Sequence, residues 1–140
     1  MLLIKRLGID DARVLIAGAR AKAEEIGVPM CIAIADEPGQ LIAFERMDGG
    51  KVTSTTIAQD KAFTAAGAKR TTESYGAASQ PGQPAYGINS AIGGRLSVVA
   101  GGIPILVDNQ VVGAIGISSG TPAQDSLCAQ AGIDKFTDTL

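Results

Sequence analysis

Lys61 is the side chain in this sequence with the clearest potential for chemistry. At helical spacing it shares a face with three apolar residues, Ile57, Ala58 and Ala65, so packing of that face would bury the lysine stem and lead its ammonium into a cleft. A desolvated lysine serves as a base, a Schiff-base nucleophile or an anchor for an anion. The alternatives are a lysine that buries only its stem and one held in a structural ion pair. The sequence leaves the chemical and the structural interpretations of Lys61 open.

Asp125 is the second candidate, because it falls in the first turn of a predicted helix. The helix dipole favours an anion there, so capping alone would account for this residue. The preceding residues Ser118, Ser119 and Thr121 add hydroxyl groups and backbone amides, and such a helix start can bind a carboxylate or stabilise an oxyanion. We therefore predict that these three residues contact a ligand, with Asp125 as a base or an orienting group.

Further candidates lie in two other parts of the chain. Arg46 and Asp48 bracket the end of a predicted strand and are candidate ligand contacts, although an ordinary surface pair or turn cap would use the same residues. Tyr75 and Tyr86 fall in a long polar segment, where they would line a pocket or contact a second subunit.

The chain has no His, and this absence excludes several kinds of site. It removes the Ser-His-Asp triad, the Cys-His dyad, zinc sites with His ligands and a His-ligated haem. We predict no metal site. Any chemistry must therefore come from Lys, carboxylates, hydroxyls and backbone amides.

Charge and hydropathy indicate the kinds of partner. The chain has 12 Lys and Arg against 14 Asp and Glu, a net charge of −2, and only 4% aromatic residues, which argues against nucleic acid. No apolar run approaches the roughly 18 residues of a membrane span. Lys5 and Arg6 follow four apolar residues, the reverse of the order in a signal peptide. We predict a cytoplasmic protein with no nucleic-acid or membrane partner, and two buried thiols, Cys31 and Cys128.

The 140 residues suit a single domain, which we predict to span residues 1–140. Hairpin connections rather than crossovers indicate a mainly antiparallel sheet, so the predicted fold class is α+β. The segment 70–94 is too long for an ordinary connection, and we predict a functional or subunit-contacting excursion with short helical turns. The predicted elements are a helix from the N-cap Asp10 to Ile26, strands Met30–Ala35 and Leu41–Met47, a helix Ser54–Lys69, strands Leu96–Ala100, Ile103–Val107 and Val111–Ser118, and a helix from the N-cap Thr121 towards Phe136.

Several blocks of this sequence, taken together, resemble one known family. In their order and spacing they resemble the GlcG/HbpS-like family, also called the haem-degrading domain, which includes the C-terminal domain of the PduO proteins. Gly102 and Pro104 lie in one of these blocks and join the candidate ligand contacts. The blocks are Asp36–Gly39, Phe44–Gly49 (FERMDG), Ile57–Ala65 (IAQDKAFTA), Gly101–Ile105 (GGIPI), Gly113–Ser118 (GAIGIS) and the pair Gln124-Asp125.

The resemblance implies a profilin-like fold with a five-stranded antiparallel sheet flanked by helices. It also implies assembly into a homo-oligomer, with pockets near the subunit interfaces. The function that it suggests is that of a small-ligand-binding protein, with haem or a related tetrapyrrole as the ligand. Without a His, the iron would depend on weaker ligands such as Thr, Tyr, Met or Lys.

The alternative is an enzyme. It would be a metal-independent catabolic isomerase or lyase/hydratase acting on a small carboxylate or carbonyl compound, with Lys61 and Asp125 as the acid and base groups. A purely structural or regulatory subunit is a third interpretation. Geometry separates them, because the enzyme requires Lys61 and a carboxylate to converge on one cavity, whereas the structural subunit predicts no convergent polar cavity.

Overall fold

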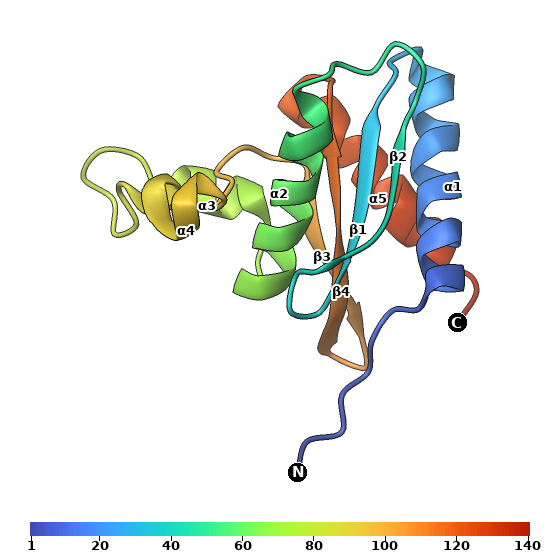
Figure 1. Ribbon diagram of the computed structural model, residues 1–140, viewed down its shortest axis with the longest axis horizontal. Coiled ribbons are helices and arrows are strands. Elements are labelled where there is room, and N and C mark those ends of the chain that lie inside the picture. The colour runs from blue at the N-terminus through green and yellow to red at the C-terminus, as the bar shows by residue number, and fades with distance from the viewer.

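The computed structural model covers residues 1–140 and is built around one antiparallel sheet of four strands (Figure 1). The strands lie in the order β2-β1-β4-β3, so β1 and β4 are central and β2 and β3 form the edges. Pro104 lies in an edge strand, the place in a sheet where a residue without an N–H is tolerated. The strands are β1 (Cys31–Asp36), β2 (Leu41–Arg46), β3 (Gly102–Val107) and β4 (Gln110–Ser118).

Helices cover both faces of the sheet (Figure 1). On one face, α1 (Ile9–Ile26) and α5 (Pro122–Thr137) pack over β-branched side chains, among them Ile32, Ile34 and Ile115. On the other face, α2 (Ser54–Ala68) packs over small residues such as Cys31 and Ala33. The main hydrophobic core therefore lies between the sheet and the α1–α5 pair.

The backbone of α2 rests directly on the sheet. A Cβ atom built on Gly116 of β4 would lie only 2.1 Å from the carbonyl oxygen of Ala58, and one on Gly102 of β3 would lie 2.5 Å from that of Lys61. The glycines of the sheet and the alanines of α2 thus permit the same close contact. The face of α2 that carries Ala58 and Ala65, which the sequence predicts to be packed, therefore packs against the sheet.

The prediction of a fifth strand at Leu96–Ala100 is wrong, because this segment pairs with no strand. Its backbone bonds instead to Thr64 of α2: the Ser97 amide donates to the threonine Oγ1 over 2.9 Å, and this hydroxyl lies 3.2 Å from the Arg95 carbonyl oxygen. A Cβ on Gly76 would lie 2.4 Å from the Val98 carbonyl oxygen. The segment therefore packs against helices. An apolar run that packs in this way has the same sequence pattern as a buried strand.

The helix ends show where local signals decide the structure. At the start of α5 the Thr121 hydroxyl accepts from the Gln124 amide at 3.2 Å, and the Gln124 side chain accepts from the Thr121 amide at 2.9 Å. This confirms Thr121 as the predicted N-cap and forms a capping box with Gln124. The prediction of Asp10 as N-cap of α1 is wrong. The N-cap is Gly8, whose amide donates to the Asp11 carboxylate at 2.7 Å, so the helix begins earlier.

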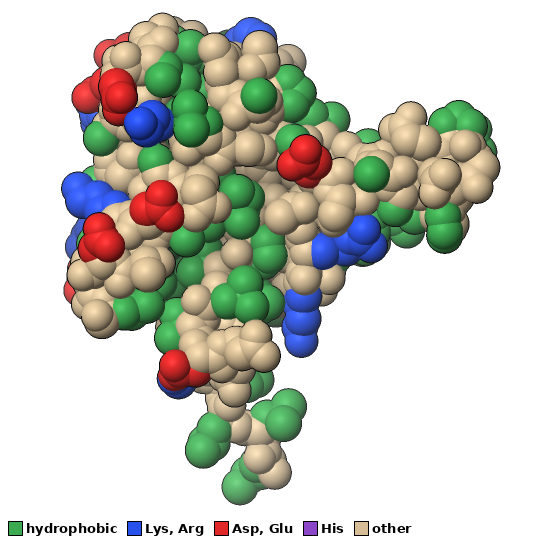
Figure 2. Space-filling model, turned by 180° about the vertical axis from the view of Figure 1, so that it is seen from behind, with side chains coloured by type: hydrophobic (Ala, Val, Ile, Leu, Met, Phe, Trp, Pro, Cys, Tyr) green, Lys and Arg blue, Asp and Glu red, His purple; other side chains and the backbone are tan.

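Two segments extend from this body. The first is the arm, residues 79–100, which together with α3 (Thr72–Ala78) forms the projection in Figure 1 and contains the short helices η1 (Ile88–Ser90) and α4 (Ala91–Gly94). No residue of the arm is buried. The second is the tail, Met1–Ile4, whose four apolar side chains are all exposed (Figure 2). No helix of the structure is long and apolar enough to cross a membrane.

Candidate functional site

Lys61 and Asp125 meet in a buried ion pair. The Lys61 Nζ lies 2.8 Å from Oδ2 of Asp125 and donates a second hydrogen bond, of 2.9 Å, to the carbonyl oxygen of Ile117. The two side chains are only 2% and 3% exposed. The pair joins the middle of α2 to the end of β4 and the first turn of α5, three elements that are far apart in the sequence. Lys61 thus meets a carboxylate, but in a sealed contact and not at a cavity.

Strained backbone surrounds this pair. Gly101 has φ +130°, and a Cβ there would lie 2.8 Å from the Lys61 Nζ. Ser119, with φ +107°, holds a conformation that is rare for a residue other than glycine. Its hydroxyl accepts a 3.0 Å hydrogen bond from the Lys51 amide. Non-glycine residues in such conformations are concentrated at functional sites, so this corner is the candidate site.

The polar groups at the start of α5 are already occupied. The second carboxylate oxygen of Asp125 accepts from the Gly120 amide at 2.9 Å. The amides of Gln124 and Asp125 donate to the hydroxyl and the carbonyl oxygen of Thr121, and Pro122 has no N–H. The helix start thus leaves few free amides for an external anion.

Ser118 and Arg46 lie in one row across the sheet. Cys31 of β1 pairs with Arg46 on one side and with Ser118 on the other. The Ser118 hydroxyl donates to that of Ser54 at 3.0 Å, whereas Arg46 is exposed. Asp48 is exposed as well and forms no ion pair with Arg46. The structure therefore gathers Ser118 near the Lys61–Asp125 corner and leaves Arg46 and Asp48 at its edge.

The two predicted contacts in β3 lie under α2. Gly102 pairs with Gly116 and Pro104 with Ala114. The Gly102 amide donates to the Thr72 hydroxyl over 2.9 Å, in a buried contact. These residues are occupied by intramolecular contacts in the single chain.

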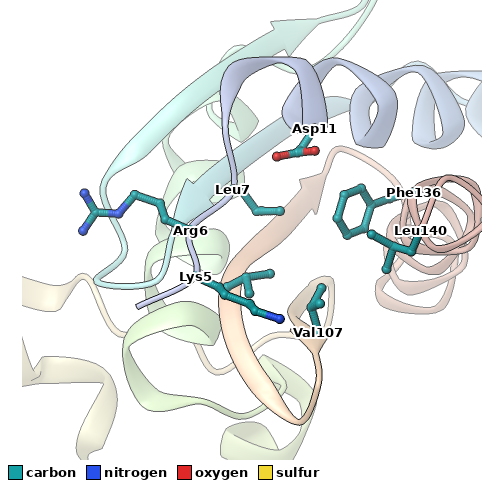
Figure 3. A pocket seen from close by; sticks show the side chains of 8 residues that line it. Lys5, Arg6, Leu7, Asp11, Val107, Phe136 and Leu140 are labelled. Carbon is teal, nitrogen blue, oxygen red and sulfur yellow. The ribbon is translucent and has the colours of Figure 1, made fainter. Parts of the chain in front are cut away.

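None of the nine predicted site residues lines a pocket. The structure has four pockets, of about 250–290 Å³. Figure 3 shows the one of about 290 Å³, between the N-terminal segment and α5, where Leu7, Val107 and Phe136 supply apolar walls. The two cations at its rim are already paired, Lys5 with Asp108 and Arg6 with Glu37, and the Asp11 carboxylate accepts from the Gly8 amide. This pocket extends the hydrophobic core to the surface.

Another pocket, of about 250 Å³, lies between α2, α3 and the arm. Of its lining residues, sequence reasoning named only Tyr75. It missed Phe63 and Thr64, which follow Lys61 on α2. The signal in the sequence was the unusual length of the 70–94 segment, which does not reveal what it packs against. Tyr86 lines none of the four pockets.

Cys31 and Cys128 are free and buried, as predicted. Burial raises the pKa of the Cys128 thiol to about 11, and the nearby negative charge of Asp125 adds to the shift. Burial also raises the pKa of Cys31, against smaller opposing effects of Thr55 and Arg46. No group of three or more Cys, Asp or Glu side chains is placed to hold a metal ion.

These features define an α+β protein with helices on both faces of an antiparallel sheet and a sealed Lys–Asp pair beneath the first turn of its last helix. Residues 7–134 match the family model described as "Haem degrading protein HbpS-like". The chain belongs to the HbpS-like family, which confirms the resemblance read from the sequence blocks.

Three similar proteins illustrate the relationship. An uncharacterized 15.0 kDa protein of Citrobacter freundii, from the dhaT-dhaS intergenic region, is 35% identical over 96% of this chain and 95% of its own length. The crystal structure of Klebsiella pneumoniae protein ORFY is 34% identical, has a TM-score of 0.96 and covers 98% of this chain and 94% of its own. That of the PduOC:heme complex is 31% identical, with a TM-score of 0.89 over 93% and 94% of the two chains.

Proposed function

We propose that this protein binds a small molecule, with haem or a related tetrapyrrole as the ligand, and that no His ligates the iron. The observation that carries the proposal is the similarity to the PduOC:heme complex, a haem-bound chain with 31% identity over nearly the same length. The absence of His separates this chain from a His-ligated mode of binding. The ring must then be held mainly by apolar contact, with a weak axial ligand at most.

The side chains that could bind the haem iron are consistent with weak ligation. Cys31, Cys128, Met30 and Lys61 are fully buried or paired, which leaves exposed or partly exposed donors such as Tyr75. Each pocket of the single chain, at about 250–290 Å³, is below the roughly 300–1,000 Å³ of sites that enclose a drug-sized ligand. We therefore propose a site near a subunit interface in a homo-oligomer, where a second copy covers the ring.

A haemin titration tests the proposal. We expect a saturable change in the Soret band near one haemin per chain or per interface. Protoporphyrin IX, which lacks iron, should bind within about tenfold of the haemin affinity, because a tenfold difference corresponds to only about 1.4 kcal/mol for the axial bond. Linear, non-saturable uptake of haemin would overturn the haem assignment. A much weaker affinity for protoporphyrin IX would overturn the weak-ligand mode.

The enzyme with Lys61 and Asp125 as acid and base is the second candidate. The observation for it is their 2.8 Å contact beside the strained Ser119. The geometry supports it less, because both side chains are nearly fully buried and neither lines a pocket. The test is turnover of small carboxylates and carbonyl compounds by the wild type and by Asp125→Asn. Turnover that survives in the variant would remove this assignment.

A further inference from the structure

The pocket between α2, α3 and the arm has the build of a ligand site, and we call it the aryl slot. Its walls include Phe63, Thr64, Gly67, Ala68, Tyr75 and Ile92, around a volume of about 250 Å³. Two aromatic rings thus face a space bordered by small residues of α2. The Thr64 hydroxyl, which donates to the Asp60 carbonyl at 2.7 Å and accepts from the Ser97 amide, is used within the chain, and most of the residues that line the slot are hydrophobic.

Each ring of the aryl slot is fixed by an arginine. The guanidinium of Arg95 lies 3.9 Å from the Phe63 ring centre, and that of Arg70 lies 4.3 Å from the Tyr75 ring centre. Arg95 is itself held by Asp60 at 3.0 Å, and Arg70 by the Ser74 hydroxyl at 2.8 Å. Such stacking orients the rings before a ligand arrives, which lowers the entropy lost on binding.

Gly67 keeps the aryl slot open. Glycine inside a helix costs roughly 1 kcal/mol relative to Ala, and three other helical glycines have a packing reason. A Cβ on Gly18, Gly76 or Gly132 would approach neighbouring atoms to 2.8, 2.4 and 2.6 Å. A Cβ on Gly67 would meet nothing within 4 Å. Packing does not require this glycine, and its missing side chain leaves free space beside the slot.

The wall on the arm side is strained. Ile92 has φ +53° and a side chain that is 60% exposed, and the next residues, Gly93 and Gly94, also have positive φ. A β-branched residue in the left-handed region is a clear outlier, and such strain persists where the surroundings or the function require it. Here it places an apolar side chain at the slot rather than in the body of the protein.

The charge beside the aryl slot is positive. Arg70 has a hydroxyl and a ring as partners but no carboxylate, and the adjacent Lys69 forms no ion pair either. We propose that the aryl slot binds the flat apolar ring of a ligand that carries a carboxylate, with Arg70 facing the anion. An aromatic acid and a tetrapyrrole with propionate groups share this chemistry. The inference does not depend on haem binding by the protein.

The test uses 1-naphthoate as the probe, with 1-naphthamide as its neutral counterpart, and measures affinity by calorimetry on the full chain. We expect saturable naphthoate binding at one site per chain and at least a tenfold weaker affinity for naphthamide.

Gly67→Leu should fill the aryl slot and lower the naphthoate affinity more than tenfold, while the thermal midpoint of the variant stays at or above the wild-type value because Leu favours helix. Arg70→Gln should lower the naphthoate affinity by about tenfold, in line with a lost charge-assisted hydrogen bond. Lys135 is an exposed cation on α5, so Lys135→Gln should leave the naphthoate affinity unchanged.

Haemin titrations of the same variants identify the source of the ligand. If Gly67→Leu weakens both naphthoate and haemin binding, the slot takes the edge of a tetrapyrrole. If it weakens naphthoate alone, the slot serves an aromatic acid and is separate from any haem site. Absence of saturable naphthoate binding, equal binding of the amide, or full affinity in a folded Gly67→Leu variant would overturn the inference. A wild type that binds naphthoate but not haemin would overturn only the proposed haem function.

Discussion

At the scale of single residues, the contact between Lys61 and Asp125 connects α2, β4 and α5 in one buried point. Both charged groups are buried, and each is hydrogen-bonded. Lys61 donates to Asp125 and Ile117, and Asp125 accepts from Lys61 and Gly120. Removing one partner of such a pair leaves the other as an unpaired buried charge, which is far more costly than removing both.

Lys61→Met should therefore lower the free energy of unfolding by about 3–5 kcal/mol. The methionine retains most of the lysine stem, so the loss reports the stranded Asp125 carboxylate rather than a cavity. Urea denaturation followed by circular dichroism measures the change.

The matched control is the double variant Lys61→Met with Asp125→Asn, which removes both charges. It should recover part of the stability lost in Lys61→Met. A single variant as stable as the wild type, or a double variant that is less stable than the single one, would contradict the assignment of the pair as a structural connection.

The two thiols provide a second prediction at this scale. Cys128 is fully buried with its pKa raised to about 11, and Cys31 is buried with its pKa raised as well. Since the thiolate is the reactive form, Ellman's reagent at pH 8 should titrate no thiol in the folded protein and two after denaturation in guanidinium. Rapid reaction of one thiol in the native state would show that its site opens.

At the scale of the elements, the contact of α2 with the sheet depends on Gly116. Gly116→Ala would bring a methyl group within 2.1 Å of the Ala58 carbonyl oxygen, so α2 must move off the sheet. We expect a loss of at least the roughly 1–3 kcal/mol typical of overpacked sites, measured by urea denaturation. Gly67→Ala on the same helix is the contrasting variant, with an expected gain of about 1 kcal/mol. A stable Gly116→Ala protein would contradict the close contact.

The segment before α1 is held by the pair of Arg6 and Glu37, and this gives a pH dependence. The Arg6 guanidinium hydrogen-bonds the carboxylate and holds the pKa of Glu37 below its ordinary value. A lowered carboxyl pKa stabilises the fold above the unfolded pKa of about 4.3, and this contribution is lost as the pH falls through the lowered value.

Arg6→Gln should therefore reduce the thermal midpoint at pH 7, and the difference from the wild type should shrink as the pH falls below about 4.3 and through the lowered pKa of Glu37. Arg13→Gln is the control, because Arg13 and its partner Asp10 are 71% and 93% exposed and such pairs contribute little. A difference in thermal midpoint that does not shrink as the pH is lowered through the acid range would show that Arg6 acts through packing instead.

The elements that could be predicted from sequence are those whose signals are local. The N-cap Thr121 was predicted correctly, because the chemistry of this helix start lies within four residues. Leu96–Ala100 was predicted as a strand because an apolar run looks alike in a sheet or against a helix, and the deciding partner, Thr64, is about thirty residues away.

The candidate site follows the same rule. The face shared by Lys61 and Ala58 predicted correctly that the lysine stem is buried. Asp125 was paired with Lys61 only within the enzyme hypothesis, from its position at a helix start, because the spacing of 64 residues between them carries no information about contact. The aryl slot also depends on distant pairs, Phe63 with Arg95 for example, so only Tyr75 and the length of the 70–94 segment pointed to it.

At the scale of the whole molecule, both projecting segments carry exposed apolar side chains, in addition to those on the body (Figure 2). On the arm, Tyr86 is 70% and Ile92 60% exposed, and on the tail Leu3 is 97% exposed. The arm has no buried residue of its own, so its contacts with the chain stabilise it little. Projecting apolar segments of this kind are typical of surfaces that another chain covers.

A second copy of the chain that covered the arm would bury Tyr86 and Ile92 and enclose the aryl slot beside them. The oligomeric state is therefore the decisive measurement for this molecule. Native mass spectrometry should give a mass that is a multiple of 14.2 kDa. Tyr86→Asp combined with Ile92→Asn should shift the protein towards the monomer, since Asn tolerates the positive φ of position 92 and the loss cannot be assigned to strain. Leu127→Asn, at a side chain on α5 that is 47% exposed, should leave the mass unchanged. A wild type that is monomeric at micromolar concentration would contradict assembly through the arm and would require the ligand to bind to one chain alone.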